Sequence, residues 1–199
     1  MHDTSASRRE ELRRAAYEMA GELGFGELTV AGIAEHIGLS KGNIHHYFDS
    51  KEELIEQAVR YAHAQFRKAV LDRLRNASSP SERLWSVIDG SFTPELFELK
   101  YRRLWISIFD VAKTNSRLKR LLDILDRRTN MLVMGSLRHL VPASRVETTG
   151  FGIMALMDGC WLLAVWEPEI TRQVALQMIA DHIQANIPNF DMSIVNISE

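Results

Sequence analysis

The sequence predicts an all-α protein of about nine helices. Apolar residues recur at helical spacing along most of its 199 residues, and no segment shows the convincing alternation of a strand. All five prolines lie after residue 79, where they mark helix starts or ends. We predict an N-terminal domain of three helices over residues 1–51, which contains a helix-turn-helix, and a larger helical domain over residues 52–199.

Capping signals define the predicted helices in order. Thr29 and Ser40 cap two short helices on either side of Gly38, and a capping box at residues 50–53 opens a longer one. The tail after Pro188 shows no period and is expected to be loose. Further helix starts are predicted at Ser79-Pro80, at Thr93-Pro94, near Ser116, at a capping box over residues 144–147, and at Pro168.

Composition and charge limit the class of protein. Hydrophobic residues make up 46% and charged residues 25%, the balance of a soluble globular protein, and the net charge of -2 argues against a protein that coats nucleic acid. The polar start lacks the apolar run of a signal peptide. The apolar stretch from Phe151 to Trp166 is broken by Asp158 and is too short to span a bilayer. These observations predict a cytoplasmic protein without a membrane partner.

The turn between the second and third predicted helices carries the chemistry of DNA recognition. Gly38 permits a tight turn, and Ser40 starts a helix whose first N–H groups can meet phosphates. Gly42 lets the backbone approach a duplex closely. Side chains that donate hydrogen bonds lie on the exposed face of this helix, namely Lys41, Asn43, His45 and His46.

Residues 29–54, which read TVAGIAEHIGLSKGNIHHYFDSKEEL, resemble the signature of the TetR family of bacterial regulators across nearly its whole length. The resemblance implies that the protein binds double-stranded operator DNA. His45 stands where many members have a tyrosine that touches the DNA backbone. The implied contacts are Thr29 and Lys51 on phosphates, Lys41, Gly42, Asn43 and His46 in the major groove, and Ser40, His45 and Tyr47 beside them.

Other interpretations of these residues remain open. The aromatic side chains of Tyr47 and Phe48 also suit a hydrophobic core. The arginines between residues 8 and 14 suit either phosphates or a solvated helix start, because acidic residues lie among them. His45 and Asp49 share a helical spacing, but no further ligand motif accompanies them, so neither a metal site nor a cofactor is predicted.

Four segments of the second domain resemble the choline-sensing BetI-type repressors, a narrower group of the TetR family. The resemblance extends in weaker form over most of residues 80–187 and implies a small-molecule effector, choline or a related amine. This chain has Phe109, followed by Asp110, where that group tends to carry a second tryptophan. The four segments are Gly90-Ser91-Phe92, residues 104–109 (LWISIF), Arg127-Arg128 and residues 155–162 (ALMDGCWL).

An organic cation is held by aromatic faces with an acid nearby, and the second domain supplies both. Trp105 and Phe109 lie one helical turn apart with Asp110 beside them, and acids at positions 89, 110 and 158 have apolar neighbours. Core packing is the alternative for any single aromatic residue, and Asp158 also suits a role that pins its helix. The candidate effector-binding residues are Phe92, Trp105, Phe109, Asp110, Asp158 and Trp161.

The last two predicted helices have apolar surface to spare. The family resemblance implies that they pair with their copies in a homodimer, which sets two recognition helices about 34–36 Å apart. A ligand would move the pocket helices and the helix that starts at Lys51, and so change this separation. Small residues that allow a partner helix to approach closely are Gly150, Gly152, Ala155 and Gly159.

The sequence thus predicts a ligand-responsive, DNA-binding transcriptional repressor. An enzyme is not predicted, because the sequence has no nucleophile elbow, phosphate-cradling glycine loop, paired-carboxylate motif or metal-ligand set. A helical adaptor that does not bind DNA would leave the pattern over residues 38–51 unexplained. The alternative within the family is a regulator of an efflux or catabolic operon that senses an apolar or aromatic ligand.

Overall fold

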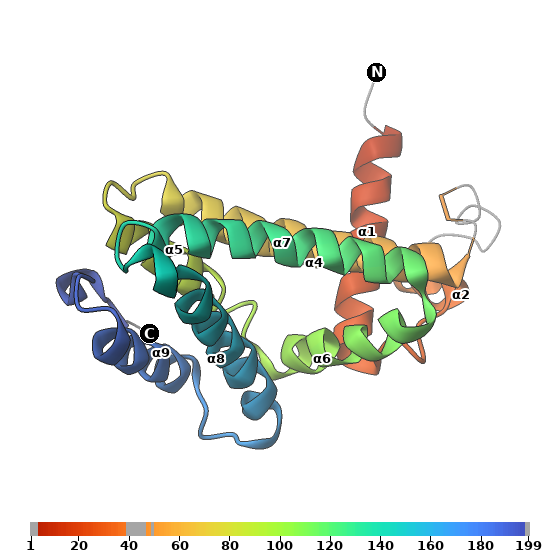
Figure 1. The fold of residues 1–199 in the computed structure, drawn as a ribbon. Coiled ribbons are helices and arrows are strands. Elements are labelled where there is room, and N and C mark those ends of the chain that lie inside the picture. The colour runs from red at the N-terminus through yellow and green to blue at the C-terminus, as the bar shows by residue number, and fades with distance from the viewer. Residues whose placement is uncertain (1–3, 39–46, 49, 198–199) are drawn as a thin grey trace. The chain divides into compact units, whose positions relative to one another are not determined.

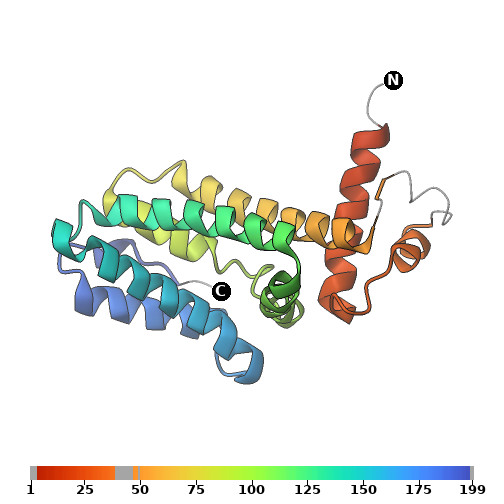
Figure 2. The same cartoon turned by 45° about the vertical axis from the view of Figure 1, so that its right-hand side comes forward.

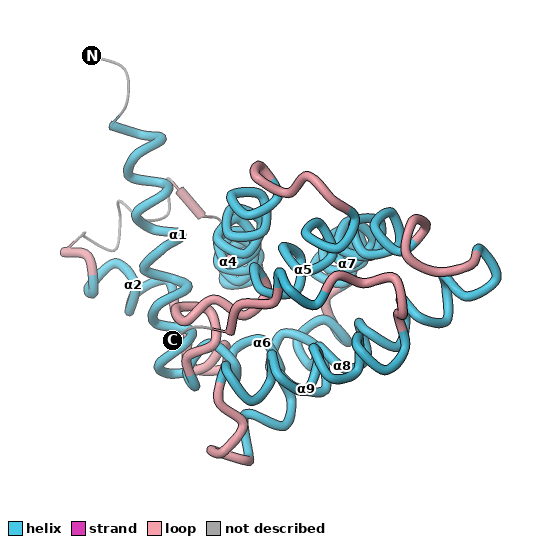
Figure 3. Tube along the Cα trace, turned by 90° about the vertical axis from the view of Figure 1, so that its left-hand side faces the viewer, coloured by secondary structure: helices cyan, strands magenta, loops and turns pink. Residues whose placement is uncertain are grey.

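The computed structural model describes residues 4–38, 47–48 and 50–197. The secondary structure in these ranges consists of α-helices and 3₁₀ turns and includes no strand (Figures 1 and 3). The prediction of an all-α protein is therefore confirmed. Two short 3₁₀ turns, η1 (Ala143–Arg145) and η2 (Met192–Ile194), accompany the longer helices. The α-helices are α1 (Thr4–Leu23), α2 (Val30–His36), α4 (Lys51–Leu74), α5 (Pro80–Gly90), α6 (Leu99–Thr114), α7 (Ser116–Leu137), α8 (Val146–Trp166) and α9 (Arg172–Asn186).

The helices gather into two compact units. The first unit comprises residues up to Gln65 together with Arg103–Leu121, and the second comprises Phe66–Arg102 and the chain from Leu122 onward. Helices α4, α6 and α7 each contribute residues to both units. The functional boundary predicted between residues 51 and 52 is a separate division and stays a prediction.

In the first unit, α1 packs on α2 and on the beginning of α4. Leu12 of α1, Ile33 of α2 and Leu54 of α4 are fully buried. Arg13 Nε donates a hydrogen bond of 2.7 Å to Gln57 Oε1, which ties α1 to α4 beside this core. The apolar spacing of each short helix therefore serves to bury one face against its neighbours.

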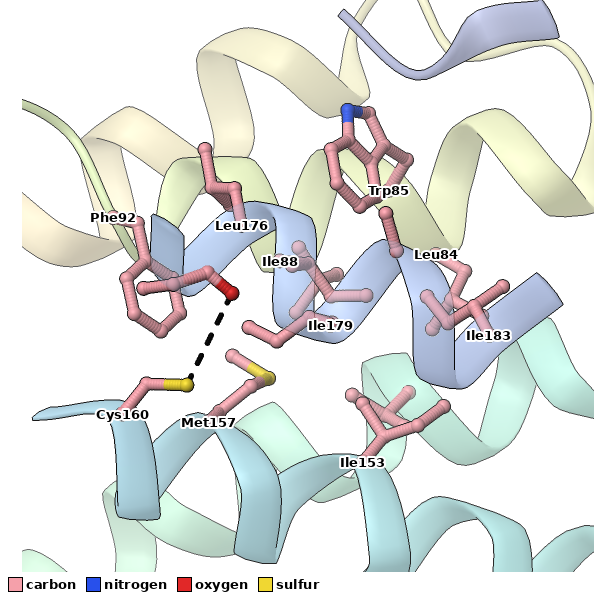
Figure 4. Packing of buried hydrophobic residues seen from close by; sticks show 14 of the residues in the cluster. Leu84, Trp85, Ile88, Phe92, Ile153, Met157, Cys160, Leu176, Ile179 and Ile183 are labelled. Atoms are coloured by element: carbon pink, nitrogen blue, oxygen red, sulfur yellow. Dashed lines mark hydrogen bonds between the residues drawn. The ribbon is translucent and has the colours of Figure 1, made fainter. Parts of the chain in front are cut away.

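The core of the second unit lies between α5, α8 and α9. Figure 4 shows Ile88 of α5, Ile153 of α8 and Ile179 of α9 meeting in this core, and all three are fully buried. Helices α8 and α9 lie side by side in opposite directions (Figure 2). Cys160 lies between them, and burial raises the pKa of its thiol to about 11, so it is a packing residue rather than a reactive thiol.

Two predicted helix starts are confirmed in detail. Thr29 caps α2, because its Oγ1 accepts a hydrogen bond of 3.0 Å from the Gly32 N–H. Ser79 and Glu82 form a capping box at the start of α5, in which the Ser79 hydroxyl accepts from the Glu82 N–H and the Glu82 carboxylate accepts from the Ser79 N–H. Residues three positions apart thus fix both helix starts.

Two other predicted starts are wrong, and one predicted cap is absent. Residues 94–97 form a turn and α6 begins only at Leu99, because Phe97 and its neighbours are drawn into the core. Pro168 lies in a turn before α9, whose N-cap is Thr171. Helix α8 begins at Val146, inside the predicted range of residues 144–147, but η1 precedes it and no side chain caps it, so the predicted capping box is wrong.

The tail after Pro188 is packed rather than loose as far as residue 197, where the described chain ends, which corrects the prediction. The Asp191 N–H donates to Ser81 Oγ at 3.0 Å, and Asn189 Nδ2 donates to the Leu140 carbonyl at 3.2 Å. Phe190 is buried in the same core as α5 and α9. One aromatic side chain and two long-range hydrogen bonds therefore hold a segment that has no periodic pattern.

Candidate DNA-binding and effector sites

The described part of the helix-turn-helix ends at a glycine that its backbone requires. Gly38 has a φ of 69°, a left-handed conformation that favours glycine, and it comes directly after Ile37, the C-cap of α2. Thr29 lies exposed at the other end of α2, and its hydroxyl is already engaged as the N-cap. The predicted DNA contacts at Ser40, Lys41, Gly42, Asn43, His45 and His46, and the His45–Asp49 spacing, lie outside the described residues.

Lys51 lies beside the loop that leads into α2. Its Nζ donates a hydrogen bond of 2.6 Å to the carbonyl of Gly26, three residues before Thr29. The structure thus brings the two predicted phosphate contacts, Lys51 and Thr29, to one loop although they lie far apart in the sequence. Lys51 is also the first residue of α4, so a positive side chain stands at a helix N-terminus whose N–H groups favour anions.

The residues after the turn divide between core and surface. Phe48 is only 1% exposed, so its predicted role in packing is confirmed. Tyr47 is half-buried, and its carbonyl accepts a hydrogen bond of 3.2 Å from Arg9 of α1. Arg9 is one of the arginines that the sequence leaves open between phosphates and a solvated helix start, and its contact with Tyr47, 38 residues away, leaves no periodic signal.

The other arginines of α1 are occupied by acidic or amide side chains of their own unit. Arg8 pairs with Glu11 at 2.7 Å, and Arg14 lies 3.9 Å from Glu18. Arg13 bonds to Gln57 of α4 and pairs with Glu10. Of the two open interpretations for this helix start, these pairs favour a solvated, salt-bridged surface.

Three aromatic rings of the second unit form a continuous group, the aromatic cluster Phe92, Phe97 and Trp161. The ring of Trp161 lies 6.0 Å from that of Phe92 and meets that of Phe97 edge-on at 5.2 Å. The guanidinium carbon of Arg102 lies 4.9 Å from the centre of the Phe97 ring. The cluster therefore already carries one cation on an aromatic face.

Two acids of the second unit, Asp158 and Asp126, repel each other. Asp158 lies one turn before Trp161 on α8. The pKa of the Asp158 carboxyl is raised, mainly by partial burial and to a smaller extent by repulsion from Asp126 of α7. Partial burial and repulsion from Asp123 raise the pKa of Asp126 in turn. Both side chains remain accessible to solvent. A cation that approached them would relieve the repulsion, since opposite charge favours the ionised carboxylate.

The remaining predicted effector residues belong to the first unit. Trp105 meets His63 of α4 edge-on at 4.9 Å, and Phe109 is 58% exposed. Asp110 pairs with Lys113 at 3.0 Å on the exposed side of α6, so it is surrounded by water rather than by apolar side chains. The structure therefore brings together Phe92, Trp161 and Asp158 in one unit, and places Trp105, Phe109 and Asp110 in the other.

Asp89 and Gly150 also differ from the sequence interpretation. Both oxygens of Asp89 are engaged by arginines, Arg73 and Arg172, so this acid is not available to an external cation. A side chain on Gly150 would collide with Met134 of α7, so Gly150 serves packing within the chain and not the approach of a partner.

Helix α8 exposes a stripe of large apolar side chains. Leu162 and Trp166 are 44% and 62% exposed, and Gly159 lies on the same side with no atom within 4 Å of where its Cβ would be. The stretch Ala143–Trp166 is long and apolar enough to cross a membrane by length and composition alone, although core helices of soluble proteins pass the same criterion. Among the described residues, no group of three or more His, Cys, Asp or Glu side chains could hold a metal ion.

Comparison with known proteins identifies the family. Residues 12–58 match the bacterial regulatory proteins of the TetR family, and residues 80–188 match the C-terminal part of the BetI-type transcriptional repressors. The transcriptional regulator BetI of Klebsiella pneumoniae strain 342 is 30% identical over 185 residues, which are 92% of this chain and 95% of that protein. The BetI of Escherichia coli strain UMN026 is 32% identical over 159 residues, 79% of this chain and 82% of that protein.

A solved structure extends the comparison to the fold. A transcriptional regulator from Saccharomonospora viridis, crystallised in complex with choline, superposes with a TM-score of 0.82 at 19% identity and covers 93% of this chain and 98% of that one. The curated relatives are transcriptional regulators and not enzymes. The chain belongs to the TetR family and, within it, to the BetI-type repressors, so it is a ligand-responsive, DNA-binding transcriptional repressor.

Proposed function

We propose that this repressor works in the cytoplasm as a homodimer whose affinity for operator DNA is set by a small organic cation, with choline as the first candidate. The observation that carries the choice of effector is the aromatic cluster, together with the carboxylate of Asp158 one turn before Trp161 on α8. Aromatic faces and carboxylates together bind a quaternary ammonium group, which has no N–H to donate. The choline complex of the Saccharomonospora viridis regulator supports this choice at the level of the fold.

Calorimetric titration tests the effector. Choline should bind more tightly than its neutral isostere 3,3-dimethylbutanol, by about 2 kcal/mol or roughly 30-fold, because only the cation gains from the rings and carboxylates. Trp161→Ala and Asp158→Asn should each remove most of this difference. Asp181→Asn is the matched control, because Asp181 is an exposed acid of α9 that bonds to Gln177.

The titration also separates the two candidate ligand classes. Equal binding of choline and 3,3-dimethylbutanol would favour an apolar or aromatic effector and would contradict the proposal of a cationic one. The absence of binding by choline, betaine and spermidine at millimolar concentration would do the same. Neither outcome would touch the assignment to the family, which depends on residues 12–58 and 80–188.

For DNA, we propose phosphate contacts from Thr29, Lys51 and Arg9, with base contacts from the residues after the turn. Thr29 and Lys51 flank one loop, and Arg9 donates a hydrogen bond to the carbonyl of Tyr47. The residues proposed in or beside the major groove remain those of the sequence prediction, Ser40, Lys41, Gly42, Asn43, His45, His46 and Tyr47. A gel shift with the DNA upstream of the gene, at stated salt concentration, tests this binding.

The exposed stripe on α8 is the proposed dimer interface. A Cβ on Gly159 has no neighbouring atom of the described chain within 4 Å, so a larger side chain there points first at whatever covers this face of α8. Gly159→Leu should therefore raise the monomer fraction in ultracentrifugation and weaken operator binding. Gly135→Leu is the matched control, because Gly135 of α7 is equally open within the chain. A fully dimeric Gly159→Leu protein would remove this stripe from the interface.

A further inference from the structure

A network of three charged residues joins α4, α5 and α9 within the second unit. The Asp89 carboxylate of α5 pairs with Arg73 of α4 through Oδ2, and with Arg172, the first residue of α9, through Oδ1 at 2.6 Å. The side chains of Asp89 and Arg172 are only 17% and 15% exposed. Because a shielded charge that loses its partner is left uncompensated, these pairs resist being broken one at a time.

Arg172 also bonds to the wall of the aromatic cluster. Its Nε donates a hydrogen bond of 2.6 Å to the backbone carbonyl of Phe92, while another nitrogen of the same guanidinium holds Asp89. Phe92 is fully buried, and its ring packs on those of Trp161 and Phe97. A displacement of these rings therefore moves the carbonyl that orients Arg172.

Helices α4 and α5 approach backbone to backbone beside this network. A Cβ on Gly90, the residue after Asp89, would lie 2.8 Å from the Cα of Val70 on α4. Arg73 follows Val70 by one helical turn, so a steric contact and an ion pair hold α4 against α5 at the same place. Since close-packed backbones do not compress, a shift of α5 carries this part of α4 with it.

We infer that Asp89 is a positioning residue through which the aromatic cluster acts on α4. The inference rests on the proposed function, in which an effector binds at the cluster and α4 begins at a DNA contact, Lys51. An effector that displaces Trp161 moves the Phe92 carbonyl, and this changes how Arg172 pairs with Asp89. Because Asp89 also pairs with Arg73, the C-terminal end of α4 then moves as well. Asp89 itself is not an effector ligand, because arginines engage both of its oxygens.

A double-mutant cycle tests this coupling without any effector. Trp161→Phe disturbs the cluster mildly, and Asp89→Asn removes the charge of the carboxylate while it keeps the shape. Hydrogen–deuterium exchange of the full-length protein reports how often the amides of residues 66–74 open. We expect Trp161→Phe to speed this exchange several-fold in the wild-type background and to add nothing in the Asp89→Asn background. Asp72→Asn is the matched control, because Asp72 makes exposed ion pairs on the same helix.

A second measurement uses choline as the probe and DNA binding as the readout. Millimolar choline should change the affinity of the wild type and of Asp72→Asn for the upstream DNA by about 5–150-fold. The Asp89→Asn variant should still bind choline in the calorimeter, yet its DNA affinity should change by less than about twofold. A purely structural role for Asp89 would lower stability without uncoupling these two binding events.

The outcomes separate this inference from the proposed function. Additive effects of Trp161→Phe and Asp89→Asn on exchange overturn the inference, as does a choline response of Asp89→Asn equal to that of the wild type. A wild-type protein that fails to bind choline overturns the choice of effector alone. In that case the exchange cycle still decides whether Asp89 couples the cluster to α4.

Discussion

Replacing Gly90 by alanine probes the close approach of α4 and α5 with a single methyl group. The new Cβ would lie 2.8 Å from Val70 Cα, 2.9 Å from its Cγ2 and 3.0 Å from its nitrogen. Two of these atoms belong to the backbone, so the helices themselves must separate. Such overpacking costs about 1–3 kcal/mol, and the gain in helix propensity at the last residue of α5 offsets less than about 1 kcal/mol of it. We expect the free energy of unfolding to fall by about 1–2 kcal/mol.

Urea unfolding at fixed protein concentration, followed by tryptophan fluorescence, measures this change. Gly135→Ala is the control, because nothing lies within 4 Å of its added Cβ and Gly135 is inside α7. That variant should gain about 0.5–1 kcal/mol from helix propensity alone. A Gly90→Ala protein as stable as Gly135→Ala would refute the contact between α4 and α5 and weaken the argument for coupling through Asp89.

Four further substitutions give separate tests. Lys51→Ala should weaken binding to all DNA sequences alike and lower by about one the slope of log affinity against log salt concentration. Asn43→Ala should instead reduce the free energy of binding by about 1–3 kcal/mol, mainly on the operator. Titrations of operator and unrelated DNA at several salt concentrations measure both effects. Ser79→Ala should lower the free energy of unfolding by about 1 kcal/mol through loss of the capping box, and an unchanged urea midpoint would contradict the cap. The raised pKa of Asp158 means that the folded chain holds this proton more tightly than the unfolded chain. The wild type should therefore lose stability relative to Asp158→Asn as the pH rises from about 4, and choline affinity should fall as the pH is lowered through the raised pKa.

Helix starts could be predicted where a local motif was complete, and not where it was partial. Ser79-Pro80 is followed by Glu82, whose carboxylate returns to the Ser79 N–H, and α5 begins there. After Thr93-Pro94, Leu96 stands where Glu82 stands after Ser79-Pro80, so no carboxylate can return to the cap. Thr93 Oγ1 accepts only a long hydrogen bond of 3.4 Å from the Leu96 N–H. These residues form a turn that buries Leu96 and Phe97 instead of a helix, because the second unit gains more from apolar side chains in its core than from one more helical turn.

The candidate sites show where sequence periodicity stops being informative. Spacing along one helix placed Trp105 and Phe109 on one face, but it could not tell which part of that face is covered, and Phe109 is 58% exposed. The charge partners that matter most lie far apart in the sequence, as with Arg172 and Asp89, which are 83 residues apart. Asp126 was not a candidate at all, because its closeness to Asp158 depends on how α7 packs on α8 and not on any motif.

Helix α4 is held by a charged network in each of the two units, and the two networks connect it to different neighbours. In the first unit, the buried carboxylate of Glu56 pairs with Arg60 of the same helix at 2.7 Å and with Arg117 of α7 at 3.2 Å. In the second unit, Arg73 pairs with Asp89 of α5. The pair between Asp89 and Arg172 is shielded at both ends and tolerates little displacement, whereas Arg60 and Arg117 are 50% and 77% exposed and water can screen their pairs with Glu56. In the coupling proposed above, an effector that moves the end of α4 disturbs the pair between Arg73 and Asp89, so this pair favours the position of α4 in which both charges are matched.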